Sequence, residues 1–149
     1  MIGNPTPAEY ATMLRQDFST FAARCFYDLN PQAGLLMNWH IEVIAAKLAA
    51  VRAGQLRRLI INLPPRHLKS LMASIAFPAW CLGHDPSAQI LCVSYAQDLA
   101  DKLARDCRSI MMSPWCESAS NREPRRIPTY PFDPRGESVL NGGPDRRRS

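Results

Sequence analysis

Apolar residues recur at helical spacing over the first third of the chain. Thr6, Pro7 and Glu9 carry the signature of a helix start, because threonine caps the first turn, proline fits its first position and glutamate reaches back to the amide of the cap. The apolar positions that follow keep to one helical face: Tyr10, Met13, Leu14, Phe18, Phe21 and Ala22. Residues 30–34 (Asn-Pro-Gln-Ala-Gly) then indicate a turn.

A second helix is predicted over residues 39–53. Its apolar face comprises Ile41, Ile44, Ala45, Leu48 and Val51. Gly54 follows directly, and glycine most readily takes the left-handed conformation that ends a helix. The N-terminal part of the chain, residues 6–53, is therefore expected to be helical.

Two short apolar segments interrupt the helical pattern. Residues 59–63 (Leu-Ile-Ile-Asn-Leu) and 89–94 (Gln-Ile-Leu-Cys-Val-Ser) have the length and composition of buried strands. Helical patterns follow them, over about residues 69–82 and 99–113, and Pro78 predicts a kink or an early end in the first. A strand, a helix and a second buried strand in this order predict a right-handed crossover and a parallel sheet. The expected fold class is therefore α/β.

The composition changes close to Trp115. Up to that point the periodicities indicate a partial domain over residues 1–116. Its expected parts are N-terminal helices over residues 6–53, a strand–loop–helix unit over 58–83 and a strand–helix unit over 89–113. Residues 117–149 contain seven arginines and five prolines, so this tail is expected to be disordered or out of frame. Its final arginines, 146–148, are interpreted as a solvated end rather than as a phosphate contact.

The charge and the cysteine content limit the partners and the cellular compartment that we expect. The chain carries 18 basic and 13 acidic side chains, a net charge of +5, which permits an anionic partner without requiring one. The five cysteines include no CxxC pair, so we expect neither a disulfide framework nor a zinc site, and a reducing compartment. No apolar run reaches the roughly 18 residues that span a bilayer, and the N-terminus lacks the features of a secretory signal. We therefore expect a cytoplasmic protein with no membrane partner.

Lys69 and Ser70 stand where a phosphate-binding loop would place its last two residues. A loop after a buried strand can turn its amides inward, and the helix that follows points its positive end at the same place. A lysine at the helix start then contacts the β- and γ-phosphates of a nucleoside triphosphate, and the adjoining hydroxyl ligates magnesium. The two glycines of the generic signature are Leu63 and Leu68 here, so only its final lysine–serine pair remains.

The segment 63–70, Leu-Pro-Pro-Arg-His-Leu-Lys-Ser, resembles the phosphate loop of the large terminase subunits of tailed bacteriophages and prophages. The resemblance covers most of residues 35–115 and includes, in the family's order, the segments 59–62, 76–80, 93–100 and 111–115. That family packages double-stranded viral DNA with an ATP-driven motor. The resemblance implies a P-loop NTPase domain, ATP and Mg²⁺ as cofactors, and the cytoplasm of a bacterial host as location. It also implies the portal and the small terminase subunit as partners, and a homo-oligomer for full-length relatives.

The resemblance assigns roles to residues of the loop. Lys69 would contact the β/γ-phosphates, Ser70 would ligate Mg²⁺, and Arg66 would stabilise charge that develops on the γ-phosphate. Arg66 and Lys69 are thus the expected catalytic residues. The expected nucleotide-binding set is Pro65, Arg66, His67, Leu68, Lys69 and Ser70. Leu68 replaces the family's glycine and would narrow the loop, and His67 is expected to be a loop residue rather than an acid–base catalyst.

Trp39 and His40 precede a helix at a place where related motors gather residues that contact adenine. The simpler interpretation is a core tryptophan beside a hydrogen-bonded histidine. Stacking of the indole on a nucleotide base is the alternative.

The resemblance breaks off after Trp115. The acidic strand that would position magnesium and polarise water has no counterpart in the residues that follow, nor has the nuclease domain. We therefore expect a truncated or frameshifted product, inactive alone, that corresponds to the N-terminal ATP-binding segment of a DNA-packaging ATPase. The alternative is a non-catalytic basic remnant that binds nucleic acid or a partner protein.

Overall fold

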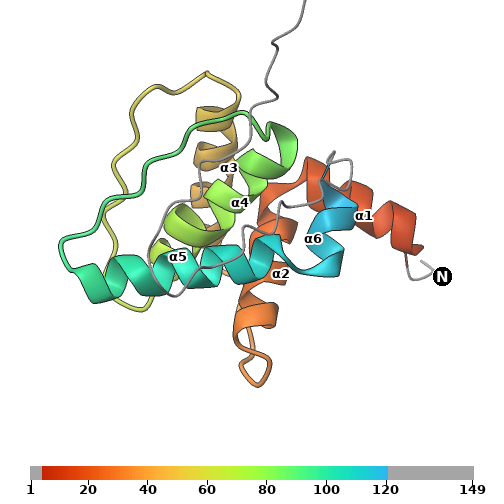
Figure 1. Ribbon diagram of the computed structural model, residues 1–149, viewed down its shortest axis with the longest axis horizontal. Coiled ribbons are helices and arrows are strands. Elements are labelled where there is room, and N and C mark those ends of the chain that lie inside the picture. The colour runs from red at the N-terminus through yellow and green to blue at the C-terminus, as the bar shows by residue number, and fades with distance from the viewer. Residues whose placement is uncertain (1–4, 121–149) are drawn as a thin grey trace, which may run out of the picture.

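The computed structural model describes residues 5–120, and within them the chain forms helices joined by turns and extended segments (Figure 1). The elements in chain order are α1 (Pro7–Gln16), α2 (Phe18–Leu29), α3 (Trp39–Arg52), the π-helical turn η1 (Leu71–Ala76), α4 (Phe77–His84), α5 (Gln97–Met111) and α6 (Pro114–Ala119). Helix α2 packs against α1, α3, α4, α5 and η1 and so occupies the centre of the arrangement.

The predicted helix start at Thr6 is confirmed. The Thr6 hydroxyl accepts a hydrogen bond from the Glu9 amide at 3.3 Å, and the Glu9 carboxylate accepts one from the Thr6 amide at 2.7 Å. The helix that begins here ends at Asp17, although the apolar pattern continues beyond it. The Asp17 carboxylate accepts hydrogen bonds from the amides of Ser19 and Thr20 and caps α2. One apolar stripe therefore spans two helices.

The predicted helix over residues 39–53 is confirmed as α3, and so is the glycine that stops it. Gly54 has a φ of +74°, the left-handed conformation expected directly after a helix end. Four of the five residues of the predicted face are buried, Ile41, Ile44, Ala45 and Leu48, and the fifth, Val51, is half-buried.

Pro78 does not end the helix in which it lies. The helix begins at Lys69 and continues to His84, and the π-helical turn η1 stands immediately before the proline. The Phe77 amide donates to the Met72 carbonyl, five residues back, as a π-turn requires. A proline ring crowds the preceding helical turn, and a wider turn at this place lets the helix continue past it.

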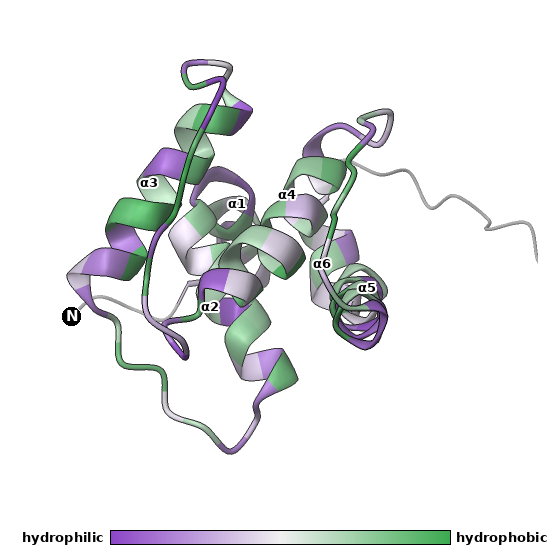
Figure 2. Cartoon of the chain, turned by 90° about the vertical axis from the view of Figure 1, so that its left-hand side faces the viewer, coloured by the Kyte–Doolittle hydropathy of each residue, from purple (hydrophilic) through white to green (hydrophobic). Residues whose placement is uncertain are grey.

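The described residues contain no β-strand, so the predicted α/β fold, with a parallel sheet of the P-loop NTPase type, is wrong. Residues 59–63 and 89–94 are extended, but in the described range they form a ladder neither with each other nor with another segment. In Figure 2 the first runs down beside α3 and the second leads into α5, with α4 between them. A strand needs a neighbour to take its amides and carbonyls, and an apolar pattern alone does not supply one.

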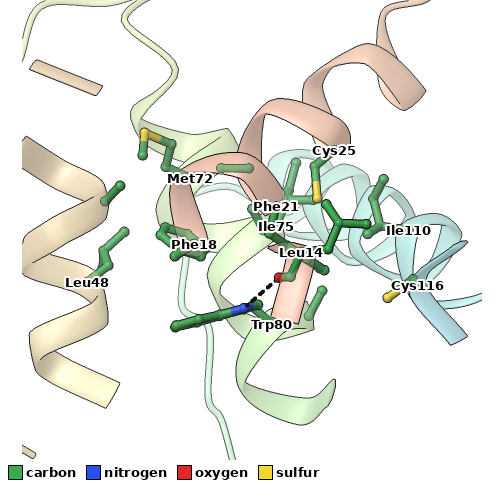
Figure 3. Packing of buried hydrophobic residues seen from close by; sticks show 14 of the residues in the cluster. Leu14, Phe18, Phe21, Cys25, Leu48, Met72, Ile75, Trp80, Ile110 and Cys116 are labelled. Carbon is green, nitrogen blue, oxygen red and sulfur yellow. Dashed lines mark hydrogen bonds between the residues drawn. The ribbon is translucent and has the colours of Figure 1, made fainter. Parts of the chain in front are cut away.

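The hydrophobic core lies where α2 meets the helix of residues 69–84 (Figure 3). The ring centroids of Phe18 and Trp80 are 5.1 Å apart, and Phe18 also meets Phe77 edge to face at 5.8 Å. The Trp80 indole donates a hydrogen bond to the Leu14 carbonyl at 3.2 Å, which ties α4 to α1. The largest side chains that are fully buried are Leu14, Phe18, Cys25, Met72 and Ile110.

Helix α6 extends past residue 116, where the partial domain was expected to end. Cys116 and Ala119 are buried, and the Arg15 guanidinium donates to the Ala119 carbonyl at 2.9 Å. The Trp115 indole donates to the Asp28 carboxylate at 3.3 Å, so α6 is fixed to both α1 and α2. The rest of the expected tail, from residue 121 and including arginines 146–148, lies outside the described residues. In residues 5–120, none of the helices has the length and apolar character needed to cross a membrane.

Candidate phosphate-binding site

The extended segment 59–63 leads into the candidate site, and its side chains alternate between half-buried and exposed. Leu59, Ile61 and Leu63 are half-buried and pack against the core, whereas Ile60 is 93% exposed. One side of the extended backbone is therefore anchored on the helices, and the loop that follows starts from a fixed point.

Two left-handed residues shape the loop. Arg66 has a φ of +67° and Leu68 a φ of +56°. A side chain with a Cβ in this conformation costs about 1 kcal/mol or more, so each residue holds local strain. His67, between them, has its Nδ1 atom 2.9 Å from the Pro65 carbonyl oxygen. The position where the resemblance implies glycine thus has the conformation that glycine favours, and the leucine there packs its side chain against the core.

Lys69 is the first residue of the helix that follows. Its ammonium group donates to the Leu63 carbonyl at 3.4 Å and so bridges the two ends of the loop. The first helical hydrogen bond runs from the Met72 amide to the Leu68 carbonyl at 2.9 Å. The amides of residues 69–71 are therefore the open donors of this helix end, where the positive end of the dipole lies. Ser70, the second helical residue, is exposed, and its side chain caps nothing.

A cluster of rings adjoins the loop. The ring centroids of His40 and His67 are 5.4 Å apart, and those of Trp39 and His40 are 6.2 Å apart. Trp39 is 72% exposed, so the interpretation of it as a core tryptophan is wrong. Asn38 caps α3 here through a hydrogen bond from the Trp39 amide to its side-chain oxygen, which places the exposed indole at the start of the helix.

The sequence on both sides of the loop carries side-chain charges of one sign. No aspartate or glutamate occurs in residues 43–84, and this stretch contains Lys47, Arg52, Arg57, Arg58, Arg66 and Lys69. Arg57, Arg58 and Arg66 are all exposed. This run of basic residues is a signal for an anion site that can be found in the sequence without any motif.

The donor set fits a nucleotide better than a bare metal ion. Among residues 5–120 there is no group of three or more histidine, cysteine, aspartate or glutamate side chains that could hold a metal. A magnesium ion would therefore enter with its phosphates, and the exposed Ser70 hydroxyl is the ligand that the loop offers it. Ammonium, guanidinium and amide donors of residues 66–71 suit the phosphates themselves.

The predicted site residues Pro65, Arg66, His67, Leu68, Lys69 and Ser70 all lie on this one turn between the extended segment and the helix. Comparisons with known protein families, with curated proteins and with solved structures gave no match.

Proposed function

We propose that residues 63–70 bind the phosphates of ATP together with Mg²⁺, and that the chain is the N-terminal nucleotide-binding segment of a terminase-type DNA-packaging ATPase. The observation that carries the phosphate-binding part of the proposal is the Lys69 ammonium, which lies at the helix start and turns back to within 3.4 Å of the Leu63 carbonyl. The resemblance of segment 63–70 to the terminase phosphate loop supports the packaging part. A phosphate that enters the loop would meet this cation and the open amides of the helix end together. Phosphate binding of this kind uses the loop and the helix start and does not itself require a β-sheet.

Each polar group of the loop has one role in this proposal. Lys69 holds the β- and γ-phosphates, Ser70 ligates Mg²⁺, and the exposed Arg66 guanidinium faces the γ-phosphate. Bound Mg²⁺ neutralises part of the phosphate charge. We expect binding without rapid hydrolysis, because residues 43–84 contain no carboxylate to orient an attacking water.

The exposed Trp39 indole supplies the second part of a nucleotide site. It stands next to the loop through the rings of His40 and His67, and a base that stacks on it would lie beside the bound phosphates. Stacking on an aromatic side chain contributes about 1–3 kcal/mol per base, so Trp39 would raise the affinity for ATP over that for phosphates alone.

In a packaging motor the same segment would work on double-stranded viral DNA in the cytoplasm of a bacterial host, with the portal and the small terminase subunit as partners and in a homo-oligomer. The basic stretch 43–84 is compatible with such an anionic partner.

Calorimetric titration of the chain with Mg·ATP tests the proposal. Lys69→Ala should weaken binding at least about tenfold, since it removes the cation that faces two phosphates. Lys102→Ala is the matched control: it removes the same charge from α5, where Lys102 pairs only with Asp106, and should leave the affinity unchanged. Equal affinity of the unmodified chain and the Lys69→Ala variant would show that the loop is not the site.

A second titration isolates the base. Trp39→Ala should weaken ATP binding several-fold and leave the affinity for inorganic tripolyphosphate unchanged, because only ATP has a base to stack. An equal loss for both ligands would mean that Trp39 supports the loop and does not touch the base.

The alternative function is that of a non-catalytic basic remnant that binds nucleic acid and does not bind ATP. The exposed Arg57 and Arg58 side chains favour it. It predicts retention on duplex DNA that falls steeply with salt, survives Lys69→Ala and drops when residues 146–148 are removed. Retention that is independent of salt would exclude it.

A further inference from the structure

The second extended segment, residues 89–95, presents a bare apolar row. Leu91, Val93 and Tyr95 alternate along the chain and are 87, 85 and 95% exposed. Figure 2 shows the hydrophobic colouring of this segment as it runs from the end of α4 to the start of α5. The segment, Leu91 and Val93 included, forms one wall of a groove of about 1100 Å³ shared with η1, α4 and α5. The side chains of the row remain almost fully exposed even so.

The same segment has the properties of an open strand edge. It is extended, and in the described part of the chain its amides and carbonyls take no backbone partner. Residues 86–97, between Asp85 and Asp98, carry no charge, and residues 87–97 contain no proline. Natural proteins protect such edges with charges or prolines unless the edge is paired, so an unprotected apolar edge indicates a binding surface.

We propose that residues 89–95 pair antiparallel with the same segment of a second copy of this chain, about a twofold axis at Val93. In this register Val93 faces Val93 of the other copy, and Leu91 faces Tyr95, so every exposed apolar side chain of the row meets an apolar one. Because the segment is uncharged, the pairing brings no like charges together.

The other candidates for the covering segment fit less well. Residues 121–149 contain five prolines, which cannot donate to a strand ladder. The nine residues between the last two prolines, 135–143, include three glycines and only two large apolar side chains, Val139 and Leu140. The segment 59–63 exposes only Ile60 among its large apolar side chains and is followed directly by two prolines. The same segment of a second copy has three exposed apolar side chains at the spacing that matches this row.

The size of the row sets the strength of the pairing. Even complete burial of the three side chains from each copy would cover no more than about 1000 Å² in total, which is at the lower end for a specific interface. The structure therefore points to a weak dimer whose population rises with protein concentration, not to a permanent one.

Sedimentation velocity over a concentration series tests the proposal. The chain should shift from monomer to dimer, and Val93→Lys should keep it monomeric, because two ammonium groups would then face each other at the axis. Ile60→Lys is the matched control: it adds the same charge at an equally bare apolar position of the other segment and should leave the dimer intact. A chain that is monomeric at all concentrations, a species that grows beyond a dimer, or equal effects of the two lysines would each overturn the proposal.

Crosslinking fixes the register. In a Cys92→Ser background, Val93→Cys places two thiols opposite each other across the axis, and a short bismaleimide should join the two copies. Ile60→Cys in the same background should give no more crosslinked dimer than the background itself. Crosslinking of Ile60→Cys as fast as that of Val93→Cys would show that contact between the copies is not specific to this segment.

Discussion

Replacing Leu68 by alanine and by glycine separates two contributions to the stability of the loop. Both substitutions remove the part of the leucine side chain that packs against the core. Only glycine also removes the Cβ atom, which is the source of strain at a φ of +56°. The comparison of the two variants therefore measures the cost of the left-handed backbone.

The expected magnitudes follow from the structure. Leu68 is half-buried, so loss of its packing should lower the free energy of unfolding by about 1 kcal/mol in the alanine variant. A left-handed residue with a Cβ costs about 1–2 kcal/mol, which the glycine variant avoids. The greater freedom of glycine in the unfolded chain lowers the free energy of unfolding by about 0.5–1 kcal/mol and offsets part of this difference. The glycine variant should therefore be more stable than the alanine variant by about 0.5–1 kcal/mol and close to the unmodified chain.

Urea denaturation followed by circular dichroism at the helical band measures these differences. Ala46→Gly is the control, because Ala46 is exposed in the interior of α3, where the same exchange should destabilise by about 1 kcal/mol. The sign of the alanine-to-glycine change is thus opposite at positions 46 and 68. If glycine were the less stable residue at position 68 as well, the left-handed loop would not be the conformation in solution.

Three further outcomes are expected. Thr6→Ala should lower the free energy of unfolding by about 1 kcal/mol. Hydrogen bonds from the Thr6 amide and hydroxyl hold the pKa of Glu9 below its usual value, so stabilisation present at neutral pH is lost as pH falls through that lowered pKa. The variant loses the hydroxyl and keeps the amide, so its urea midpoints should vary somewhat less between about pH 6 and pH 3. Burial raises the pKa of the Cys25 thiol, so maleimide should label the exposed Cys92 rapidly and Cys25 only on unfolding; Cys92→Ser should abolish the rapid phase, and rapid labelling of Cys25 in that variant would contradict its burial. Trp80→Phe leaves the Leu14 carbonyl without the indole donor and should cost about 1–2 kcal/mol in urea denaturation, whereas an unchanged midpoint would mean that this hydrogen bond contributes nothing.

Local sequence signals were sufficient wherever the structure depends on neighbours along the chain. Thr6 and Glu9 satisfy each other within one helical turn, and Gly54 ends α3 through its own backbone freedom. Lys69 is the first helical residue because the left-handed backbone of Arg66 and Leu68 cannot form part of a right-handed helix. Each of these features involves residues at most four positions apart, so the pattern of residue types contains the whole interaction.

Tertiary packing decided the rest. Residues 59–63 and 89–94 have the composition of strands, yet each lies against helices without a partner for its backbone, and a strand ladder is a property of two segments and not of one. The burial of Trp39 was likewise misjudged, because an indole at a helix start is covered only if another element reaches it. The left-handed backbone of Leu68 is maintained by the fixed ends of the loop, the anchored Leu63 and the helix that starts at Lys69, and no local preference of leucine would produce it.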